Sequence, residues 1–101
     1  MVQVIENWAE ITGTVRAVEP SDKGPAYRSV ILDVDTVTDV RDFPNLLGDT
    51  QGTTLAVIVP GTAADRVELA AGTRLRARVR RASPFEVFAS PEHLHPVPAG
   101  S

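Results

Sequence analysis

The sequence has 101 residues, of which 43% are hydrophobic and 23% are charged, with a formal net charge of −3 and no cysteine. This length predicts one domain with a core of its own, and the lack of cysteine excludes disulfides and thiolate zinc sites. No stretch approaches the roughly 18 apolar residues of a membrane-spanning helix, and the first residues lack the pattern of a secretory signal. We therefore expect a cytoplasmic protein.

The first strand pattern covers residues 10–18. Small or apolar residues alternate there with polar ones, at Ile11, Gly13, Val15 and Ala17. A period of two predicts a strand with one buried face. The glycine inside this strand indicates a bulge or a sharp bend, and the turn-forming residues 19–25 predict a loop.

Two more strands are expected within residues 27–59. Residues 27–37 alternate with Val30, Leu32 and Val34 facing inward, and the phase slips near Asp35 or Thr36, which predicts a bulge. Residues 38–52 contain several helix and strand breakers and predict a long loop. Residues 53–59 predict the third strand.

A helix of two to three turns is expected at residues 62–71, with Thr62 as its N-cap and Gly72 at its end. A strand at residues 73–81, a tight turn at 82–84 and a fifth strand at 85–89 follow. Residues 91–101 contain three prolines and predict an extended or frayed end. We therefore assign residues 1–95 to one barrel domain and residues 96–101 to a flexible, proline-containing tail.

The fourth strand carries five arginines within eight residues and no acid. Leu75, Ala77 and Val79 should face the core, which leaves the row Arg74, Arg76, Arg78 and Arg80 outside. Glu10 and Glu86 on the neighbouring strands could pair with this row, but two acids cannot neutralise five arginines. Three interpretations stay open: a partly paired, solvated face, a nucleic-acid contact, or contact with an acidic protein.

The expected element order is β-β-β-α-β-β in an all-β chain, with a glycine in the first strand and the run Gly-Thr-Arg-Leu-Arg-Ala-Arg-Val-Arg after the helix. This order resembles the oligonucleotide/oligosaccharide-binding (OB) fold, a five-stranded Greek-key barrel with one short helix. The resemblance covers roughly residues 8–94 and indicates no narrower family. An SH3-like barrel is the alternative, although it lacks a full helix at that point.

The resemblance implies a ligand face on strands two and three between two loops. It would bring basic and aromatic residues to one mouth of the barrel, namely Lys23, Tyr27, Arg28, Arg80, Arg81 and Phe85. Together with Arg74, Arg76 and Arg78 they form the candidate site for single-stranded nucleic acid, since cations contact phosphates and rings stack on bases. The face between the loops argues against this function, because it is acidic and aliphatic (Ile31, Asp33, Asp35, Thr54, Ala56 and Ile58).

The alternative function is protein–protein interaction or oligomerisation. Five aspartates (Asp33, Asp35, Asp39, Asp42 and Asp49) stand against one arginine in residues 33–49. Together with the arginine row this segment could make two charge poles that dock head to tail. Phe43, Leu46 and Leu47 would either cap the barrel or anchor a partner. A neutral oligosaccharide ranks third, because it would favour rings over arginine.

We expect no enzymatic activity, no cofactor and no metal. His93 and His95 share one face of an extended segment with Glu92 nearby, but the sequence offers them no third ligand. Asp33, Asp35 and Asp39 lack the glycine and terminal glutamate of a calcium loop. No nucleophile motif and no phosphate-binding glycine loop are present.

Overall fold

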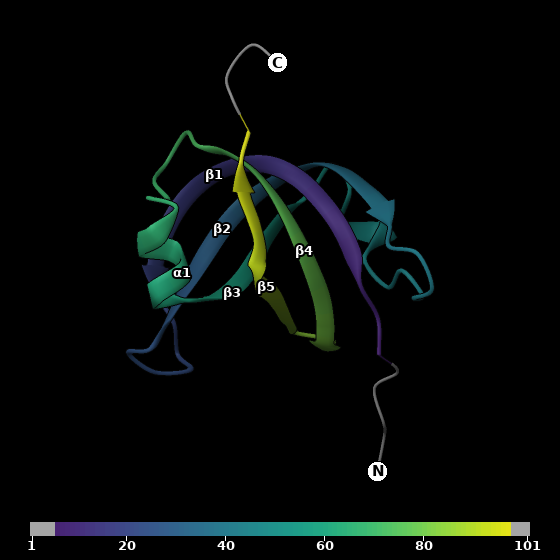
Figure 1. Ribbon diagram of the computed structural model, residues 1–101, viewed down its shortest axis with the longest axis horizontal. Coiled ribbons are helices and arrows are strands. Elements are labelled where there is room, and N and C mark those ends of the chain that lie inside the picture. The colour runs from purple at the N-terminus through teal and green to yellow at the C-terminus, as the bar shows by residue number, and fades with distance from the viewer. Residues whose placement is uncertain (1–5, 98–101) are drawn as a thin grey trace.

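The structure is a computed structural model that describes residues 6–97 as a mostly β protein. Five strands are present: β1 (Ala9–Pro20), β2 (Tyr27–Asp39), β3 (Thr54–Pro60), β4 (Arg74–Ser83) and β5 (Glu86–Pro96). They close into a barrel in the order β1-β2-β3-β5-β4, with one short helix, α1 (Gly61–Arg66), between β3 and β4. Figure 1 shows the strands curving around a common centre, with α1 beside them. The expected fold class and element order are confirmed.

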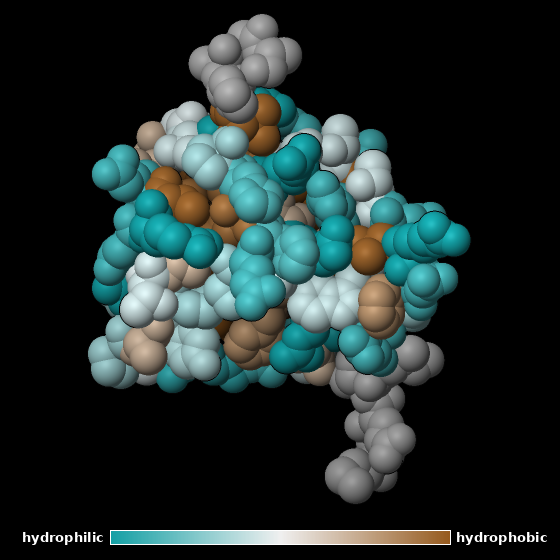
Figure 2. All heavy atoms as spheres, viewed as in Figure 1, coloured by the Kyte–Doolittle hydropathy of each residue, from teal (hydrophilic) through white to brown (hydrophobic). Residues whose placement is uncertain are grey.

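The core fills the inside of this ring because the apolar positions alternate along each strand. Buried side chains come from every strand, among them Ile11, Val15, Val30, Leu32, Val59, Leu75, Val79 and Leu94. The inward facing predicted for Leu75, Ala77 and Val79 is confirmed, since each is at most 2% exposed. On the face seen in Figure 2, hydrophilic residues cover most of the surface and hydrophobic ones form small separate groups.

Gly13 lies where β1 bends around the core. Thr12 is paired with Thr36 but Gly13 with Val34, so Asp35 is an extra residue in β2. The predicted bulge at Asp35 and the predicted irregularity at Gly13 are therefore one feature. A Cβ atom on Gly13 would lie 2.3 Å from the carbonyl oxygen of Asp33, so only glycine allows the two backbones to approach this closely.

The helix is shorter than predicted. α1 has six residues, its N-cap position is Pro60, and Thr62 lies inside the helix. It ends early because Glu68 takes a left-handed conformation (φ 53°). The Leu69 N–H then donates to the Ala64 carbonyl and the Glu68 N–H to the Asp65 carbonyl, the hydrogen-bond pattern of a Schellman motif. Gly72 also has a positive φ (93°), but it forms a later turn.

The fifth strand is longer than predicted. It leaves the ladder after Ala89, which is paired with Val79, and rejoins it at Leu94, which is paired with Ala77. Pro91 lies in this bulge, where its missing N–H breaks no ladder hydrogen bond. The guanidinium of Arg66 donates to the Pro91 carbonyl (2.6 Å) and helps to hold the bulge. Of the predicted tail, residues 98–101 lie outside the described residues.

The segment between β2 and β3 closes one end of the barrel. It contains a single 3-10 turn, Gly48–Thr50, and Leu47 is fully buried in the core. Phe43 and Leu46 are 37% and 39% exposed. Of the three candidate anchors, Leu47 therefore serves the core, whereas the other two lie at the surface.

Candidate ligand-binding groove

A groove of about 560 Å³ lies between the β1–β2 loop and the β4–β5 turn, over the outer face of β2 and β3. The loop contributes Lys23 and its neighbours, the turn contributes Phe85, and the strands contribute the floor. The lining residues are Glu19, Pro20, Ser21, Asp22, Lys23, Ser29, Ala56, Ile58, Ser83, Phe85 and Glu86. Two of the six residues expected at the barrel mouth, Lys23 and Phe85, are thus brought together.

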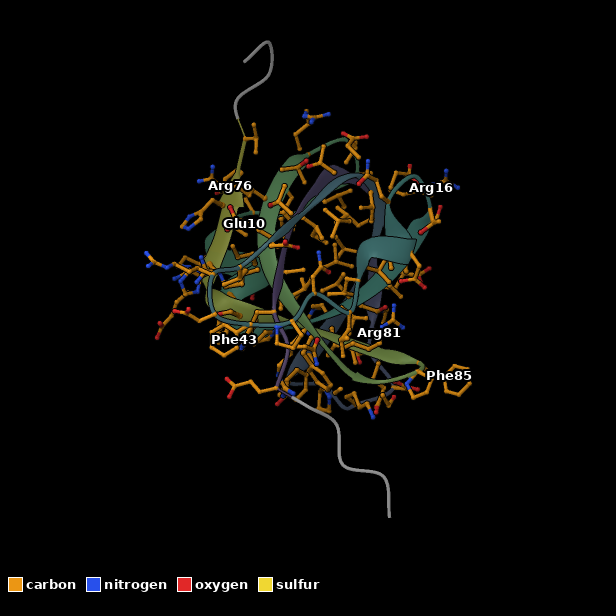
Figure 3. The ribbon with its side chains drawn as sticks, turned by 90° about the vertical axis from the view of Figure 1, so that its right-hand side faces the viewer. Glu10, Arg16, Phe43, Arg76, Arg81 and Phe85 are labelled. Atoms are coloured by element: carbon orange, nitrogen blue, oxygen red, sulfur yellow. The ribbon has the colours of Figure 1, made fainter. Side chains whose placement is uncertain are left out.

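Phe85 stands at the tip of the β4–β5 turn and is 95% exposed. In Figure 3 its ring projects beyond the body of the molecule. The turn beneath it is held from two sides: the Phe85 N–H donates to Ser83 Oγ (3.2 Å), and Arg81 Nη1 donates to the Pro84 carbonyl (3.2 Å). A large apolar ring is therefore presented to solvent on a fixed support.

Glu86 links the two walls of the groove. Its carboxylate forms an ion pair with Lys23 Nζ of the β1–β2 loop and accepts a hydrogen bond from Ser83 Oγ (3.2 Å). The side chains of Lys23 and Glu86 are 39% and 30% exposed. The carboxylate is thus oriented by two donors while part of it still faces solvent.

A second ring, Phe88, lies next to the groove and was missed by the sequence analysis. Closure of the barrel pairs Phe88 of β5 with Ile58 of β3, and the Ile58 side chain lines the groove floor. The guanidinium carbon of Arg80 lies 5.3 Å from the centre of the Phe88 ring, within cation–π distance. The alternation of Phe88 with inward Val87 and Ala89 signals its outward direction, but only the parallel β3–β5 contact places it there.

Tyr27 and Arg28 line a different hollow of about 610 Å³ on the β1–β2 loop, so they do not share a groove with Phe85. Arg28 Nη1 donates to the carbonyl oxygens of Pro25 (3.1 Å) and Tyr27 (3.2 Å). This arginine stabilises the backbone of its own loop. The prediction of one mouth that holds all six residues is therefore only partly met.

The arginine row is largely paired within the molecule. Arg76 and Arg78 both contact Glu10 (3.4 and 3.5 Å), and Arg74 contacts Asp35 (2.9 Å). Figure 3 shows Glu10 beside Arg76. The pairing expected with Glu10 is confirmed, whereas the expected pairing with Glu86 is wrong, because that carboxylate contacts Lys23 instead.

Arg81 turns away from the groove, toward the segment between β2 and β3. Its Nε donates to the Leu46 carbonyl (3.1 Å) and its Nη2 lies 3.5 Å from Asp49. Its backbone N–H and carbonyl bond to the side chain of Asn7, which is 2% exposed. Arg81 therefore ties together three segments that are distant in sequence, which is a structural role.

The predicted charge poles are partly neutralised within the fold. Asp33 pairs with Arg16 (3.1 Å), and Asp35 and Asp49 pair with Arg74 and Arg81. The acidic segment and the arginine row are thus brought together on one barrel and neutralise each other in part. Asp39 accepts a hydrogen bond from Asn45, and Asp42 lies in a turn with φ 73°.

Three large apolar residues, Trp8, Phe43 and Leu46, lie on two segments that meet at one end of the barrel, and we call these residues the end patch. The backbone N–H of Trp8 donates to the carbonyl of Pro44, which lies between the other two residues in the sequence, and Trp8 itself is half-buried. Arg81 joins the Leu46 backbone to Asn7, the neighbour of Trp8. The acids Glu6, Asp39, Asp42 and Asp49 lie in the same segments.

Within residues 6–97, no three His, Asp or Glu side chains gather closely enough to hold a metal ion. His93 Nδ1 instead forms a hydrogen bond with Ser90 Oγ (2.9 Å) in the β5 bulge. None of the described helices has the length and apolar character needed to cross a membrane.

No protein-family model matches the chain, and no curated protein matches it in sequence.

Proposed function

We propose that this protein is a non-catalytic OB-type binding module that takes single-stranded nucleic acid in the groove between the β1–β2 loop and the β4–β5 turn. Three features support the OB assignment: the strand order β1-β2-β3-β5-β4, the parallel contact of β3 with β5, and the helix between β3 and β4. The choice of single-stranded nucleic acid as the ligand is based on the residues of the groove, because a fold alone does not define function.

The observation that carries the proposal is Phe85, a ring that is 95% exposed on a supported turn at the edge of the groove. Every nucleobase has a flat face, so a fixed ring of this kind accepts any base, at about 1–3 kcal/mol per stacked base. Beyond the Ile58 floor, the exposed guanidinium of Arg80 lies over the Phe88 ring and offers a second flat surface on which a base can stack. Phe85 lines the groove, and Phe88 is paired with Ile58 of its floor.

The paired arginine row lowers the number of phosphates that the protein can contact. Around the groove, Arg80 is exposed and Lys23 is shared with Glu86, whereas Glu19 and Asp22 add negative charge. With about two phosphate contacts, the logarithm of affinity should fall by about 1.4 units per log unit of salt. Binding should therefore be modest in strength and driven mainly by stacking.

The test is a fluorescence anisotropy titration of labelled oligothymidylate at low salt. Phe85→Ala should weaken binding about tenfold through the loss of one stacked base. Phe43→Ala, which removes a partly exposed ring of the end patch, serves as the matched control and should bind as the wild type does. Equal affinity of the wild type and Phe85→Ala, or no binding by the wild type, would contradict the proposal.

A second candidate function is weak self-association through the end patch, supported by the exposure of Phe43 (37%) and Leu46 (39%). Scattered apolar residues are common on surfaces, but these three lie on segments joined by the backbone hydrogen bond from Trp8 to Pro44. The acids around the patch would repel a second copy, so added salt should strengthen this association, the opposite of its effect on nucleic-acid binding.

Light scattering over a range of protein and salt concentrations tests this second function. A mass that rises with both, and that stays at the monomer value in Leu46→Ser, is the expected result. A monomer under every condition would exclude self-association through the end patch.

A further inference from the structure

We infer that Glu86 recognises the edge of a guanine base stacked on Phe85, so that the groove prefers guanine-containing single strands. This inference rests on the proposed function and adds the base that the groove selects. Glu86 directly follows Phe85, and both line the groove. A base lying on the Phe85 ring therefore has its polar edge close to a carboxylate.

The carboxylate is held in a defined position. Ser83 Oγ donates to Glu86 Oε1 (3.2 Å), and Lys23 forms an ion pair with Oε2. Each carboxylate oxygen can accept two hydrogen bonds, so these contacts leave each oxygen able to accept one more. The same Ser83 hydroxyl accepts the Phe85 N–H, which couples the carboxylate to the support of the ring.

An ionised carboxylate accepts hydrogen bonds and donates none, so it distinguishes bases by the donors on their edges. Guanine presents two adjacent donors, N1–H and the N2 amino group, that match the two oxygens of a carboxylate. Thymine and uracil present one N–H between two carbonyl oxygens, which a carboxylate repels. Cytosine offers its N4 amino group alone and should rank between them.

Lys23 complements the same pattern. Its ammonium lies against the Glu86 carboxylate, so the pair presents an acceptor group beside a donor group. The guanine edge carries its O6 acceptor next to N1–H, the mirror of that arrangement. The Lys23–Glu86 ion pair, which crosses from one groove wall to the other, is thereby a recognition element for one base.

The experiment uses the full chain and labelled oligothymidylate in which one central base is thymine, guanine, inosine or cytosine. The wild type should bind the guanine strand about tenfold more tightly than the all-thymine strand. Inosine keeps N1–H but lacks the N2 amino group, so it should lose most of this gain. In Glu86→Gln the ratio of the two affinities, guanine strand over all-thymine strand, should fall to about one.

Asp22→Asn is the matched control, since it removes one negative charge from the same groove but leaves the Lys23–Glu86 pair intact. It should keep the preference for guanine, and circular dichroism should show both variants folded. Equal binding of guanine and thymine strands by the wild type, or a guanine preference that survives in Glu86→Gln, would overturn the inference and leave the proposed function standing. A wild type that binds none of the strands would overturn the proposed function itself.

Discussion

Gly13 shows how much one residue can decide in this barrel. The sequence pattern was sufficient to predict a bend there, because glycine inside a strand weakens it unless close backbone approach requires it. The structure gives the reason: the Asp33 carbonyl occupies the space of a Cβ atom, at 2.3 Å. The bend of β1 and the bulge at Asp35 thus depend on the same missing side chain.

Gly13→Ala should lower the free energy of unfolding by about 2–3 kcal/mol, because the backbones must separate to admit a methyl group. Urea denaturation measures the loss. Gly48→Ala is the control, since nothing lies within 4 Å of its Cβ position and it should change stability little. Equal midpoints for the two variants would show that the close contact at Gly13 is not under constraint.

Asn7 is a residue whose role the sequence did not reveal. A polar residue ahead of the first strand is normally exposed, yet Asn7 is 2% exposed and bonds to both backbone groups of Arg81 (2.9 and 2.8 Å). The two residues are 74 positions apart, so no local pattern could indicate the contact.

Asn7→Ala should cost about 2 kcal/mol, because it leaves a partly buried N–H and carbonyl of β4 without these partners. Thermal unfolding followed by circular dichroism gives the value. A variant as stable as the wild type would mean that water replaces the amide at no cost.

At the scale of elements, the strands were predicted better than the helix. Alternation with a period of two located the strands and their buried faces, including the complete inward set of β4. The helix was placed correctly in the chain, but its end was assigned to Gly72 because glycine is the usual residue there. The structure ends it at a left-handed Glu68, for which the side chain gives no signal.

Glu68→Gly should therefore stabilise the protein by about 0.5–1 kcal/mol. Glycine avoids the steric cost of a left-handed conformation, and its larger loss of conformational entropy on folding offsets part of this gain. Gly72→Ala, at φ 93°, should have the opposite sign. Chemical denaturation of both variants provides the comparison. Destabilisation by Glu68→Gly would imply that the glutamate side chain makes a contact worth more than the strain.

At the scale of the whole molecule, the largest difference from sequence-based expectation lies in the distribution of charge. Counting acids on the strands adjacent to β4 gave two partners for five arginines, which suggested free guanidinium groups. Barrel curvature brings Asp35 from β2 to Arg74, and the Leu47–Thr50 region brings Asp49 to Arg81. Asp35 and Arg74 lie on the outer surface on either side of β1, and Asp49 lies outside the strands, so counting acids on the strands next to β4 could not find these partners.

The candidate site was predictable in the same limited way. The order of elements was enough to expect a groove between two loops, and Lys23 and Phe85 do line such a groove. It could not show that Tyr27 and Arg28 face another hollow, because that depends on how the loop folds back on itself. It also could not place Phe88 beside Ile58, since the two strands meet only through closure of the barrel.

The central claim is that the groove, its rings and Arg80 contact nucleic acid, and that the three paired arginines of the row (Arg74, Arg76 and Arg78) do not. A matched pair on one strand tests it most directly: Arg80→Ala removes the guanidinium over Phe88, and Arg76→Ala removes one that is paired with Glu10. In an anisotropy titration with oligothymidylate at low salt, Arg80→Ala should weaken binding about fivefold and Arg76→Ala should leave it unchanged. Binding that falls as much in Arg76→Ala as in Arg80→Ala would contradict this account, because it would show that the paired arginines also contact nucleic acid.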